Sequence, residues 1–264
     1  MEIQTVTGRC RRILAGLSLI VPLVVLSGAY AVPLEDCQEY TRYGVPGTQG
    51  DLLCRKGYLL AHDPERKTPI WVIEHLTMER LDGPHKRTDR FKADPDLEPG
   101  QRAELSDYKK SGYARGHMAP ADNMKWDKQA MAESFYLSNM VPQVGSMNSG
   151  IWRILEAKVQ KWAKDRGGVF VFTGPIYLQD TDAKSIGTNK VAVPDQLYKI
   201  VFDPQAHEAI AFAMPNGKLE TEDMARFIVS IDLIETLTDL DFLSELDEAE
   251  QMEIESQGVG KMWQ

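Results

Sequence analysis

A histidine in a short polar segment is the residue of this chain best suited to acid–base chemistry. His117 lies in the segment 111–120, SGYARGHMAP, where Arg115 and Gly116 precede it. By itself, a histidine in such a segment is more often structural than catalytic. The segment gains interest from four polar residues that follow a short apolar stretch further along the chain: Asn139, Gln143, Asn148 and Glu156.

The reaction that these side chains could support is hydrolysis of a phosphodiester bond. That reaction needs a deprotonated water and stabilisation of the charge that develops on a crowded phosphate. A neutral imidazole with an ordinary pKa can accept a proton from water at neutral pH, which is the role we predict for His117. Mg²⁺ takes few protein ligands, so the amide of Asn148 together with phosphate oxygens of a substrate could bind it. Mn²⁺ or another divalent ion would suit the same amide.

Two of these residues also have simpler interpretations. Asn148 precedes a helical pattern, at a position where a residue that caps the helix N-terminus is expected. Glu156 follows eight residues later, ~12 Å further along a regular helix at ~1.5 Å per residue, which is too far to share the ion directly. It could still reach a metal-bound water, because helical side chains lean toward the N-terminus. Otherwise it is a solvated glutamate.

Three motifs resemble those of the DNA/RNA non-specific endonucleases of the ββα-metal (His-Me finger) class, and within it the endonuclease G group. They are RGHMAP at 115–120, YLSNMVPQ at 136–143 and NSGIWRILE at 148–156. The resemblance extends over nearly all of the chain after residue 31. Shorter matches lie at 43–47, 68–72, 173–175, 191–194 and 214–216, and at Arg87 ahead of Phe91.

The resemblance implies a role for each polar residue. The implied catalytic residues are His117, Arg115, Glu156 and Arg87. The residues implied to contact substrate are Arg87, Arg115 and Asn139, with Asn148 as the ligand of one Mg²⁺. Arg90 is the rival of Arg87, and Asn139 and Gln143 could instead brace the site. DNA and RNA would both be substrates, because contacts to phosphate carry no sequence information, and a homodimer is implied.

One position departs from the family pattern. The family has an aspartate before Arg-Gly-His, where this chain has Ala114. The substitution lowers activity if the aspartate orients the site, and changes little if it only braces the loop. Two alternatives to the nuclease therefore stay open. One is a nucleic-acid-binding protein of the same fold that has lost the chemistry, and the other is a metal-dependent phosphodiesterase for another substrate.

The elements that must position these residues alternate without a strict βαβ order. Apolar runs predict a hairpin, with strands at 56–62 and 69–76 around a turn at 63–67. Further strands are expected at 136–140, 169–175, 191–194, 197–201 and 209–214. We expect an irregular segment at 32–50 and a loop with a short helix at 82–110.

A helix is predicted from 148 to about 167, because apolar residues recur at helical spacing: Trp152, Leu155, Val159 and Trp162. The tail from 219 onward is acidic and helical in character, with 227–229 and 233–234 on its apolar side. The pattern predicts an α+β fold with a mostly antiparallel central sheet flanked by helices. The resemblance adds a ββα-metal finger as the active site.

The first 31 residues have the composition of a secretory signal peptide. Arginines at 9, 11 and 12 precede an apolar run from Ile13 to about Ser27, and the segment ends in Ala-Tyr-Ala at 29–31. We predict cleavage before Val32, with 32–264 as one nuclease domain that is periplasmic or secreted and has no stable membrane partner. A membrane anchor formed by 13–31 and a mitochondrial presequence are the alternatives.

Cysteine content fits export. After removal of 1–31 the chain keeps Cys37 and Cys54, which predicts one disulfide in an oxidising compartment. Two free thiols are the other possibility.

The formal net charge is −9, which at first argues against a polyanionic substrate. The charge is unevenly distributed, however. The segment 220–255 contains 13 acidic residues and one arginine, a balance of 1 − 13 = −12. Basic residues cluster at 85–92 and 109–110, so substrate should bind there and the acidic end should face away from it.

Overall fold

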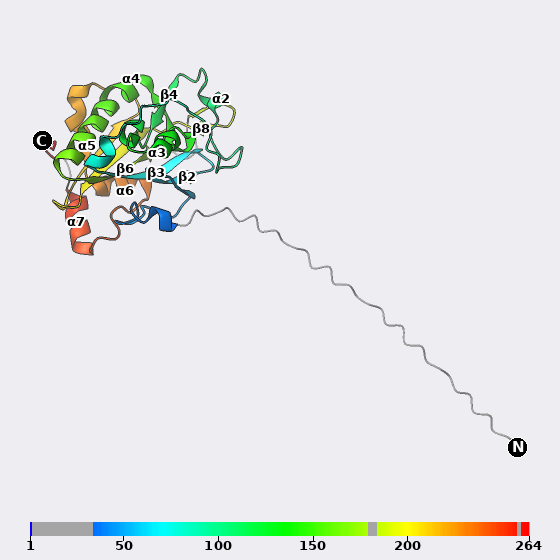
Figure 1. Ribbon diagram of the computed structural model, residues 1–264, viewed down its shortest axis with the longest axis horizontal. Helices are drawn as coiled ribbons and strands as arrows, with labels where there is room; N and C mark the ends of the chain where they lie inside the picture. Colours follow the sequence, from blue (N-terminus) through cyan, green and yellow to red (C-terminus); the bar gives the residue numbers. More distant parts are fainter. Residues whose placement is uncertain (2–33, 179–183, 258–259, 264) are drawn as a thin grey trace. The chain divides into compact units, whose positions relative to one another are not determined.

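A seven-stranded sheet forms the centre of the fold, and every neighbouring pair of its strands is antiparallel. The computed structural model describes Met1 and residues 34–178, 184–257 and 260–263. The strand order is β1-β2-β3-β6-β9-β10-β11 (Figure 1). The strands are β1 (Asp51–Cys54), β2 (Leu59–Asp63), β3 (Thr68–Leu76), β6 (Val169–Ile176), β9 (Gln196–Asp203), β10 (Glu208–Pro215) and β11 (Ile228–Val229).

The central strands form where the sequence is continuously apolar. All eight residues of β6 are buried, as expected of a strand that is covered on both faces. The predicted hairpin is confirmed as β2 and β3, and Lys67 in its turn has a φ of 61°. The strands predicted at 169–175, 191–194, 197–201 and 209–214 are also confirmed, the second of them as the short β8 (Val191–Ala192), which pairs with β7 (Ser185–Ile186).

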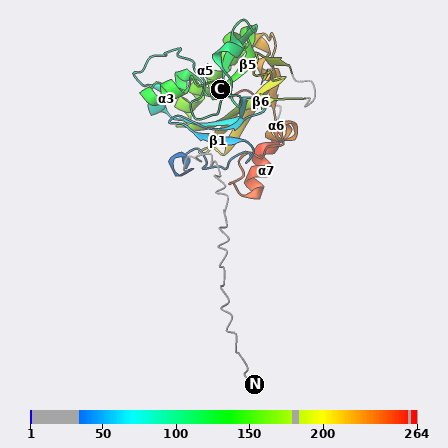
Figure 2. The ribbon, with the colours of Figure 1, turned by 90° about the vertical axis from the view of Figure 1, so that its right-hand side faces the viewer.

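Helices cover the two faces of the sheet. Val72 of β3 packs with α5 (Arg153–Asp165), whereas its neighbours Trp71 and Ile73 pack with α6 (Ile231–Thr238) and α7 (Glu248–Ser256). This alternation follows from the two-residue period of a strand. Figures 1 and 2 show α5 on one side of the sheet and the orange and red α6 and α7 on the other. The prediction of an α+β fold with an antiparallel sheet flanked by helices is confirmed.

The remaining elements are short. They are η1 (Leu34–Cys37), α1 (Met78–Leu81), α2 (Leu105–Tyr108), β4 (Tyr113–His117), η2 (Ala121–Met124), α3 (Lys128–Glu133), η3 (Leu137–Asn139), β5 (Met140–Val144), α4 (Gly145–Met147), η4 (Asn148–Trp152) and η5 (Thr221–Phe227). The short helix expected within 82–110 is α2. Met78–Leu81 forms a helix just before that loop.

Two predictions around the finger were wrong. The segment 136–140 is not a strand: Leu137–Asn139 form one turn of 3-10 helix, and the strand begins at Met140. The helix predicted from 148 begins at Gly145, and a π-helical turn with a non-helical Gly150 interrupts it before α5. Its apolar stripe is buried as expected: Trp152, Leu155, Val159 and Trp162.

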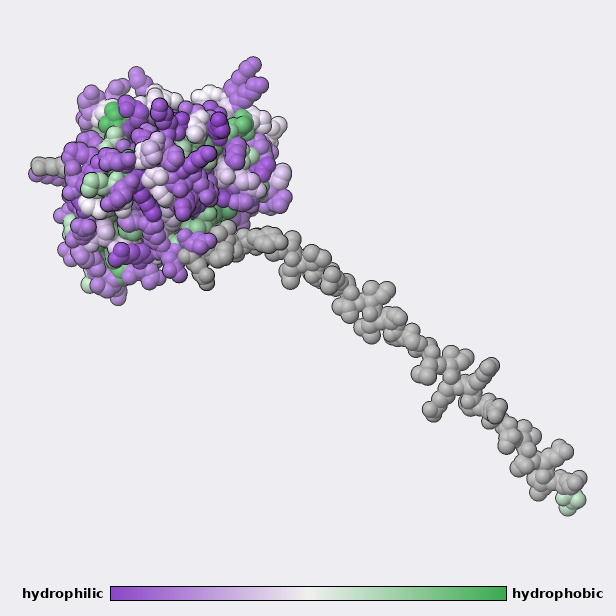
Figure 3. All heavy atoms as spheres, viewed as in Figure 1, coloured by the Kyte–Doolittle hydropathy of each residue, from purple (hydrophilic) through white to green (hydrophobic). Residues whose placement is uncertain are grey.

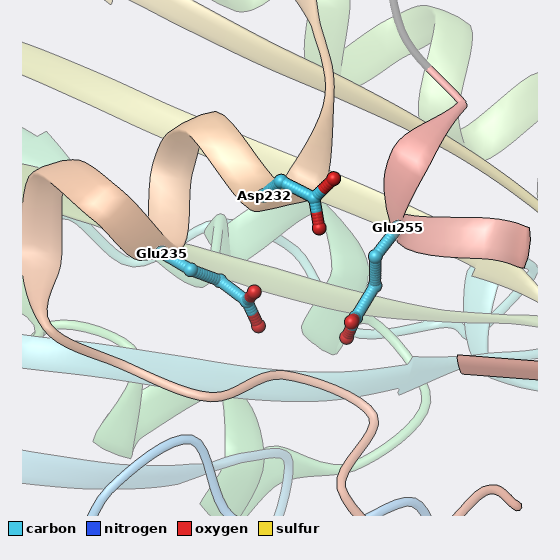
Figure 4. Close-up of side chains that lie close together, drawn as sticks. All are labelled: Asp232, Glu235 and Glu255. Carbon is cyan, nitrogen blue, oxygen red and sulfur yellow. The ribbon is translucent and has the colours of Figure 1, made fainter. Parts of the chain in front are cut away.

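Helices α6 and α7 of the acidic C-terminal region cover one face of the sheet, whereas Met224 and Ile228, earlier in that region, pack in the core on the side of β4 and β5. Ile228–Val229 form an edge strand and do not continue a helix. Of the two residues predicted on the apolar side, Ile234 is buried but Leu233 is exposed. Three carboxylates from α6 and α7 have oxygen atoms within 4.8 Å of one another: Asp232, Glu235 and Glu255 (Figure 4). The helices that carry them pack on the apolar core that contains Trp71 and Ile73. In the sequence they are far from the histidine motif.

A disulfide joins Cys37 to Cys54, with their Cα atoms 5.9 Å apart, so this prediction is confirmed. The predicted signal peptide lies outside the described residues, apart from Met1. Within the part of the chain that the structure describes, no helix combines the length and apolarity needed to cross a membrane. The surface in Figure 3 is mainly hydrophilic, with small separate hydrophobic spots.

Candidate active site

The strands β4 and β5 form a hairpin-like pair that carries the histidine. Tyr113 is paired with Val144 and His117 with Met140. The polar segment 111–120 has no alternating apolar pattern, but residues 113–117 are a strand. Because side chains alternate along a strand, Arg115 and His117 lie on one face of the pair, and Ala114 and Gly116 lie on the other.

Two phenylalanines flank the imidazole of His117. Its ring centroid lies 5.5 Å from that of Phe91 and 5.3 Å from that of Phe135, and the two phenyl rings are 4.9 Å apart. Only 7% of His117 is exposed, and its Nε2 is buried without a hydrogen-bond partner among the described residues. The ring is therefore fixed by packing, not by a hydrogen bond to Nε2.

Two arginines lie against these phenylalanines. The guanidinium carbon of Arg115 is 4.0 Å from the centroid of Phe91, and that of Arg87 is 5.2 Å from the centroid of Phe135. Arg87 also pairs with Asp89 at 2.7 Å, but its side chain is 41% exposed. Arg90 is exposed as well, and no described contact joins it to the histidine. The geometry therefore favours Arg87 over its rival.

Burial, followed by the positive charges of Arg87 and Arg115, lowers the pKa of His117 to about 3. We expected an ordinary histidine pKa, and the structure corrects this. The imidazole is neutral at physiological pH, and so has a free lone pair. Its basicity in the free protein is weak, and a phosphate bound between the arginines would restore part of it by neutralising their charge.

Asn139 is a buried brace. It is fully inaccessible, and its Oδ1 accepts from Ala119 N at 2.9 Å while its Nδ2 donates to the carbonyls of Ala119 and Ser134 at 2.8 and 3.0 Å. These bonds fasten the segment after His117 to the start of β5. They leave no exposed amide atom for a substrate, so the substrate-binding role that we predicted for Asn139 has no support in this geometry.

Asn148 lies at the junction of α4 and the π-helical turn. It has helical dihedral angles, and its side chain makes no cap hydrogen bond, so the simple N-cap interpretation does not apply. Asn148 is half-buried, and its amide has no hydrogen-bond partner in the described part of the chain. Turns of π-helix occur frequently at functional sites. Because of the interruption at Gly150, the straight-helix distance to Glu156 does not apply either.

Glu156 is half-buried in the first turn of α5. Burial raises its pKa to about 7, an effect that the positive charge of Lys199 and, more weakly, that of Arg87 reduces. The positive charge of Arg87 lowers the pKa of both Glu156 and His117. A carboxyl group with this pKa can change protonation near neutral pH.

The finger elements share one core. Met147 and Ile151, on either side of Asn148, are buried in the same apolar cluster as Met118 and Ala119, which follow the histidine. The structure thus places Arg87 and Arg115 against the two phenylalanines that flank His117. Glu156 is close enough for the charge of Arg87 to lower its pKa, and the neighbours of Asn148 share the core of the finger. Gln143 lies beneath Gly116, where a Cβ would meet its Oε1 at 2.1 Å. Glycine is required at 116 for this close approach.

The sequence contains no clear signal for the two flanking phenylalanines. Phe91 lies four residues after Arg87, and Phe135 directly precedes the 136–143 motif. Aromatic residues beside a motif give a weak signal in sequence, because most of them belong to the core.

Three other histidines have partners outside this group. His62 is fully buried, and its Nε2 lies 2.8 Å from Gln101 O. His75 stacks on Phe170, and His207 is exposed beside Glu250.

Comparisons with known proteins agree with the geometry. The family model described as DNA/RNA non-specific endonuclease matches residues 37–249. The chain is 36% identical to mitochondrial endonuclease G of Homo sapiens over 219 residues, which cover 78% of this chain and 73% of that protein. It is 37% identical to nuclease C1 of Cunninghamella echinulata var. echinulata over 221 residues, 78% and 88% of the two chains.

The structural comparison gives the same result. A chain in the crystal structure of the EndoG/EndoGI complex superposes with a TM-score of 0.78 at 32% identity, over 85% of this chain and 98% of that one. The recognised motifs, the antiparallel α+β fold and these relatives lead to one identification. This chain belongs to the DNA/RNA non-specific endonuclease family, and it is a metal-dependent nuclease that hydrolyses phosphodiester bonds.

Proposed function

We propose that the chain cleaves DNA and RNA by attack of a water that His117 deprotonates, at a phosphate bound by Arg87 and Arg115. The observation that carries this proposal is the environment of His117. Its imidazole is neutral, fixed between two phenyl rings, and lies within the field of both arginines. A bound phosphodiester would place its negative charge beside these arginines, and so next to His117, the proposed base.

We propose Asn148 as the protein ligand of the metal, with Mg²⁺ as the ion. Its unpartnered, half-buried amide offers a neutral oxygen, which is a donor that hard divalent cations accept. When bound, the ion would polarise the phosphate and stabilise the charge that develops on it. Glu156 would orient water at the ion by accepting a hydrogen bond through its carboxylate.

Lack of base specificity follows from the same residues. Each of them would contact phosphate, water or metal, which occur identically at every nucleotide of DNA and RNA. The arginines are suited to this role because a guanidinium donates two parallel hydrogen bonds to a phosphate.

The proposal is tested with supercoiled plasmid and single-stranded RNA, each incubated with the protein in Mg²⁺ or with excess chelator. We expect both substrates to be cleaved, and cleavage to stop with chelator. His117→Ala should lower turnover by a factor of ~10² or more. His207→Ala, at an exposed histidine, is the matched control and should retain full activity. Binding without cleavage would favour a nucleic-acid-binding protein, and inactivity toward both polymers a phosphodiesterase for another substrate.

The metal assignment has its own test. Asn148→Ala should shift the Mg²⁺ concentration needed for half-maximal cleavage to higher values, because the ion loses its protein ligand. An unchanged titration would remove Asn148 from the metal site. Replacing Mg²⁺ by Mn²⁺ tests whether the ion is selected.

We also propose that the first 31 residues direct the protein out of the cytoplasm. Their arginines and apolar run suit export, and the disulfide between Cys37 and Cys54 suits an oxidising compartment. Several relatives are named mitochondrial, which favours the presequence alternative. Fusion of 1–31 to a reporter, with its location followed in cells, decides between them. Light scattering of the purified protein tests the homodimer.

A further inference from the structure

A lysine and a glutamate are buried behind the active site, and the proposed mechanism uses neither. Lys199 of β9 and Glu74 of β3 are each 1% exposed. The Nζ of Lys199 donates to Thr173 Oγ1 at 2.7 Å and lies 5.0 Å from the ring centroid of Trp152. Burial of a charge is costly unless other groups compensate it. The hydroxyl and the indole ring alone compensate little of this cost.

The compensation comes from two carboxylates. Trp152, over whose ring Lys199 Nζ lies, is one turn before Glu156, and Gln160, which Asn123 joins to Glu74, is one turn after it on the same helix face. The positive charge of Lys199 lowers the pKa of both Glu74 and Glu156, while burial lowers the pKa of Lys199 itself. Glu156 is half-buried, so part of its side chain remains accessible. Lys199 therefore connects the centre of the sheet to a residue of the active site.

Hydrogen bonds fix the relative positions of these elements. Asn123, six residues after His117, donates to Glu74 Oε1 at 2.9 Å. Gln160, one turn after Glu156 on α5, donates to Asn123 Oδ1 at 2.8 Å. The network thus joins α5 and the segment after the catalytic histidine to the same buried carboxylate. Glu74 Oε2 is buried and has no partner among the described residues.

We propose that Lys199 is a positioning residue of the nuclease, which keeps Glu156 in its carboxylate form and oriented toward the active site, while Glu74 competes with Glu156 for the charge of Lys199. This inference rests on the proposed function in one respect, the use of Glu156 as a carboxylate. Lys199 itself would not touch the substrate. It acts through Glu156.

Other charged groups also act on the two glutamates. Asp122 of η2 faces Glu156 and raises its pKa, whereas Arg87 lowers it. Arg80 of α1 lowers the pKa of Glu74. Asp122 and Arg87 oppose each other at Glu156, so Lys199 is the main group that offsets its burial.

Two substitutions should shift the pKa of Glu156 in opposite directions. Lys199→Met removes the positive charge and keeps the length of the side chain, so this pKa should rise by ~1 unit or more. Glu74→Gln keeps the shape and leaves Lys199 to Glu156 alone, so the pKa should fall. The double variant should lie between Lys199→Met and the wild type. Lys199→Arg should restore most of the wild-type value.

The measurement is an NMR titration of protein labelled with ¹³C at the glutamate carboxyl carbons, with the Glu156 signal assigned by its loss in Glu156→Gln. The acid limb of kcat/KM for plasmid cleavage should move in parallel with this pKa. Lys161→Met, at an exposed lysine of α5, is the control and should shift neither quantity. A structural role alone would lower stability or activity without moving either titration.

Opposite shifts in the two single variants support the inference, and shifts in one direction or none overturn it. If Lys199→Met does not fold, the isosteric variant Glu74→Gln still decides, because the pKa of Glu156 must fall in that variant. A wild-type protein that cleaves neither DNA nor RNA would overturn the proposed function. The NMR titration would still test the charge relation between Lys199 and Glu156.

Discussion

The two arginines beside the histidine are chemically alike but differ in their surroundings from a third, Arg90. Arg87 lies over Phe135, and its charge acts on both His117 and Glu156. Arg90 is exposed and has no described contact with the site. A substitution can therefore compare two arginines three residues apart in one loop.

We predict that Arg87→Ala lowers kcat/KM for plasmid cleavage by ~10-fold or more, because one charged hydrogen-bond donor to the phosphate is worth ~1.5–3 kcal/mol. Arg90→Ala should change it less than about twofold. Initial rates at subsaturating plasmid, measured at one fixed salt concentration, give both values. Equal losses in the two variants would show that Arg87 contributes only to the general attraction of nucleic acid.

Ala114, the residue that departs from the family pattern, lies next to a buried amide. Ala114 is paired with Gln143 across the β4–β5 pair, so the two side chains lie on the same face, opposite to His117. Both amide atoms of Gln143 are buried without a partner among the described residues. An aspartate at 114 could accept a hydrogen bond from Gln143 Nε2. Position 114 therefore lies on the face of the strand pair away from His117, next to a buried amide.

Ala114→Asp should accordingly stabilise the protein by ~1 kcal/mol, because it satisfies a buried donor. We expect the activity at 25 °C to change less than about threefold. Thermal unfolding followed by circular dichroism, together with plasmid cleavage, measures the two effects. In the background of Gln143→Leu the stabilisation should disappear. A gain in activity without a gain in stability would instead place the residue at position 114 in the chemistry.

At the scale of elements, the finger depends on one buried amide. Asn139 connects Ser134, at the end of α3, to Ala119, two residues after His117, through three hydrogen bonds. Its 3-10 turn is held in addition by Ser138, which donates to the buried Asp94. The distance between the histidine strand and β5 is therefore set by polar contacts as well as by apolar packing.

Asn139→Ala should lower the free energy of unfolding by ~2–3 kcal/mol, since it leaves buried backbone groups without partners. Urea unfolding measures this loss. Cleavage should fall mainly through kcat, because the base is displaced while both arginines remain. Asn189→Ala, at a residue whose side-chain amide donates to Asp107 and has no other side-chain partner among the described residues, serves as the control. A higher KM with an unchanged kcat would revive the substrate-binding role of Asn139.

The sequence predicted those elements whose local pattern agrees with their surroundings. β6, β9 and β10 are apolar runs between turns, and each formed where expected. β4 was missed because YARGH has no alternating apolar pattern. It is a strand because it pairs with β5 and its histidine packs between two phenyl rings. The kink at Gly150 was also missed, since apolar spacing reports a helical face and not a change of axis.

The electrostatics of the site could not be predicted from the sequence. Family motifs implied which residues belong to the site, but the low pKa of His117 depends on burial that only the fold reveals. Lys199 was missed, although a lysine within the apolar strand LYKIVF is a visible signal. Its partner Glu74 is likewise the one acid within an apolar strand. Neither residue shows from its own segment that the other lies beside it.

At the scale of the whole domain, charge is divided between the two faces of the sheet. The finger and its arginines lie on one face, whereas the acidic α6 and α7 pack on the other. The expectation that the acidic end faces away from the finger is met by α6 and α7, but η5 packs against η4, the turn that begins at Asn148. A net charge of −9 is thus compatible with binding a polyanion, since fields of exposed charges are largely screened beyond ~10 Å in 0.1 M salt.

The crowded acids of that second face make stability depend on pH. Glu255 of α7 is 6% exposed, and its burial, followed by the negative charge of Glu235, raises its pKa to about 8 (Figure 4). Its ordinary value is 4.5, so the folded protein binds more protons than the unfolded chain between these two values. The stabilisation from the protonated carboxyl is complete below pH 4.5 and is lost as the pH rises through about 8.

Glu255→Gln removes this dependence because an amide of the same size cannot ionise. The thermal midpoint should rise by roughly 2–4 °C at pH 9, where the wild type contains the buried carboxylate, and stay nearly unchanged at pH 4.5. Glu253→Gln, at an exposed acid of the same helix, controls for the change in net charge. If the gain at pH 9 matched that of Glu253→Gln, general repulsion would explain it. If the midpoint rose equally at both pH values, the amide would stabilise α7 through its own hydrogen bonds. Only a gain confined to high pH, and absent from the control, shows that the docking of α7 on α6 depends on a proton at Glu255.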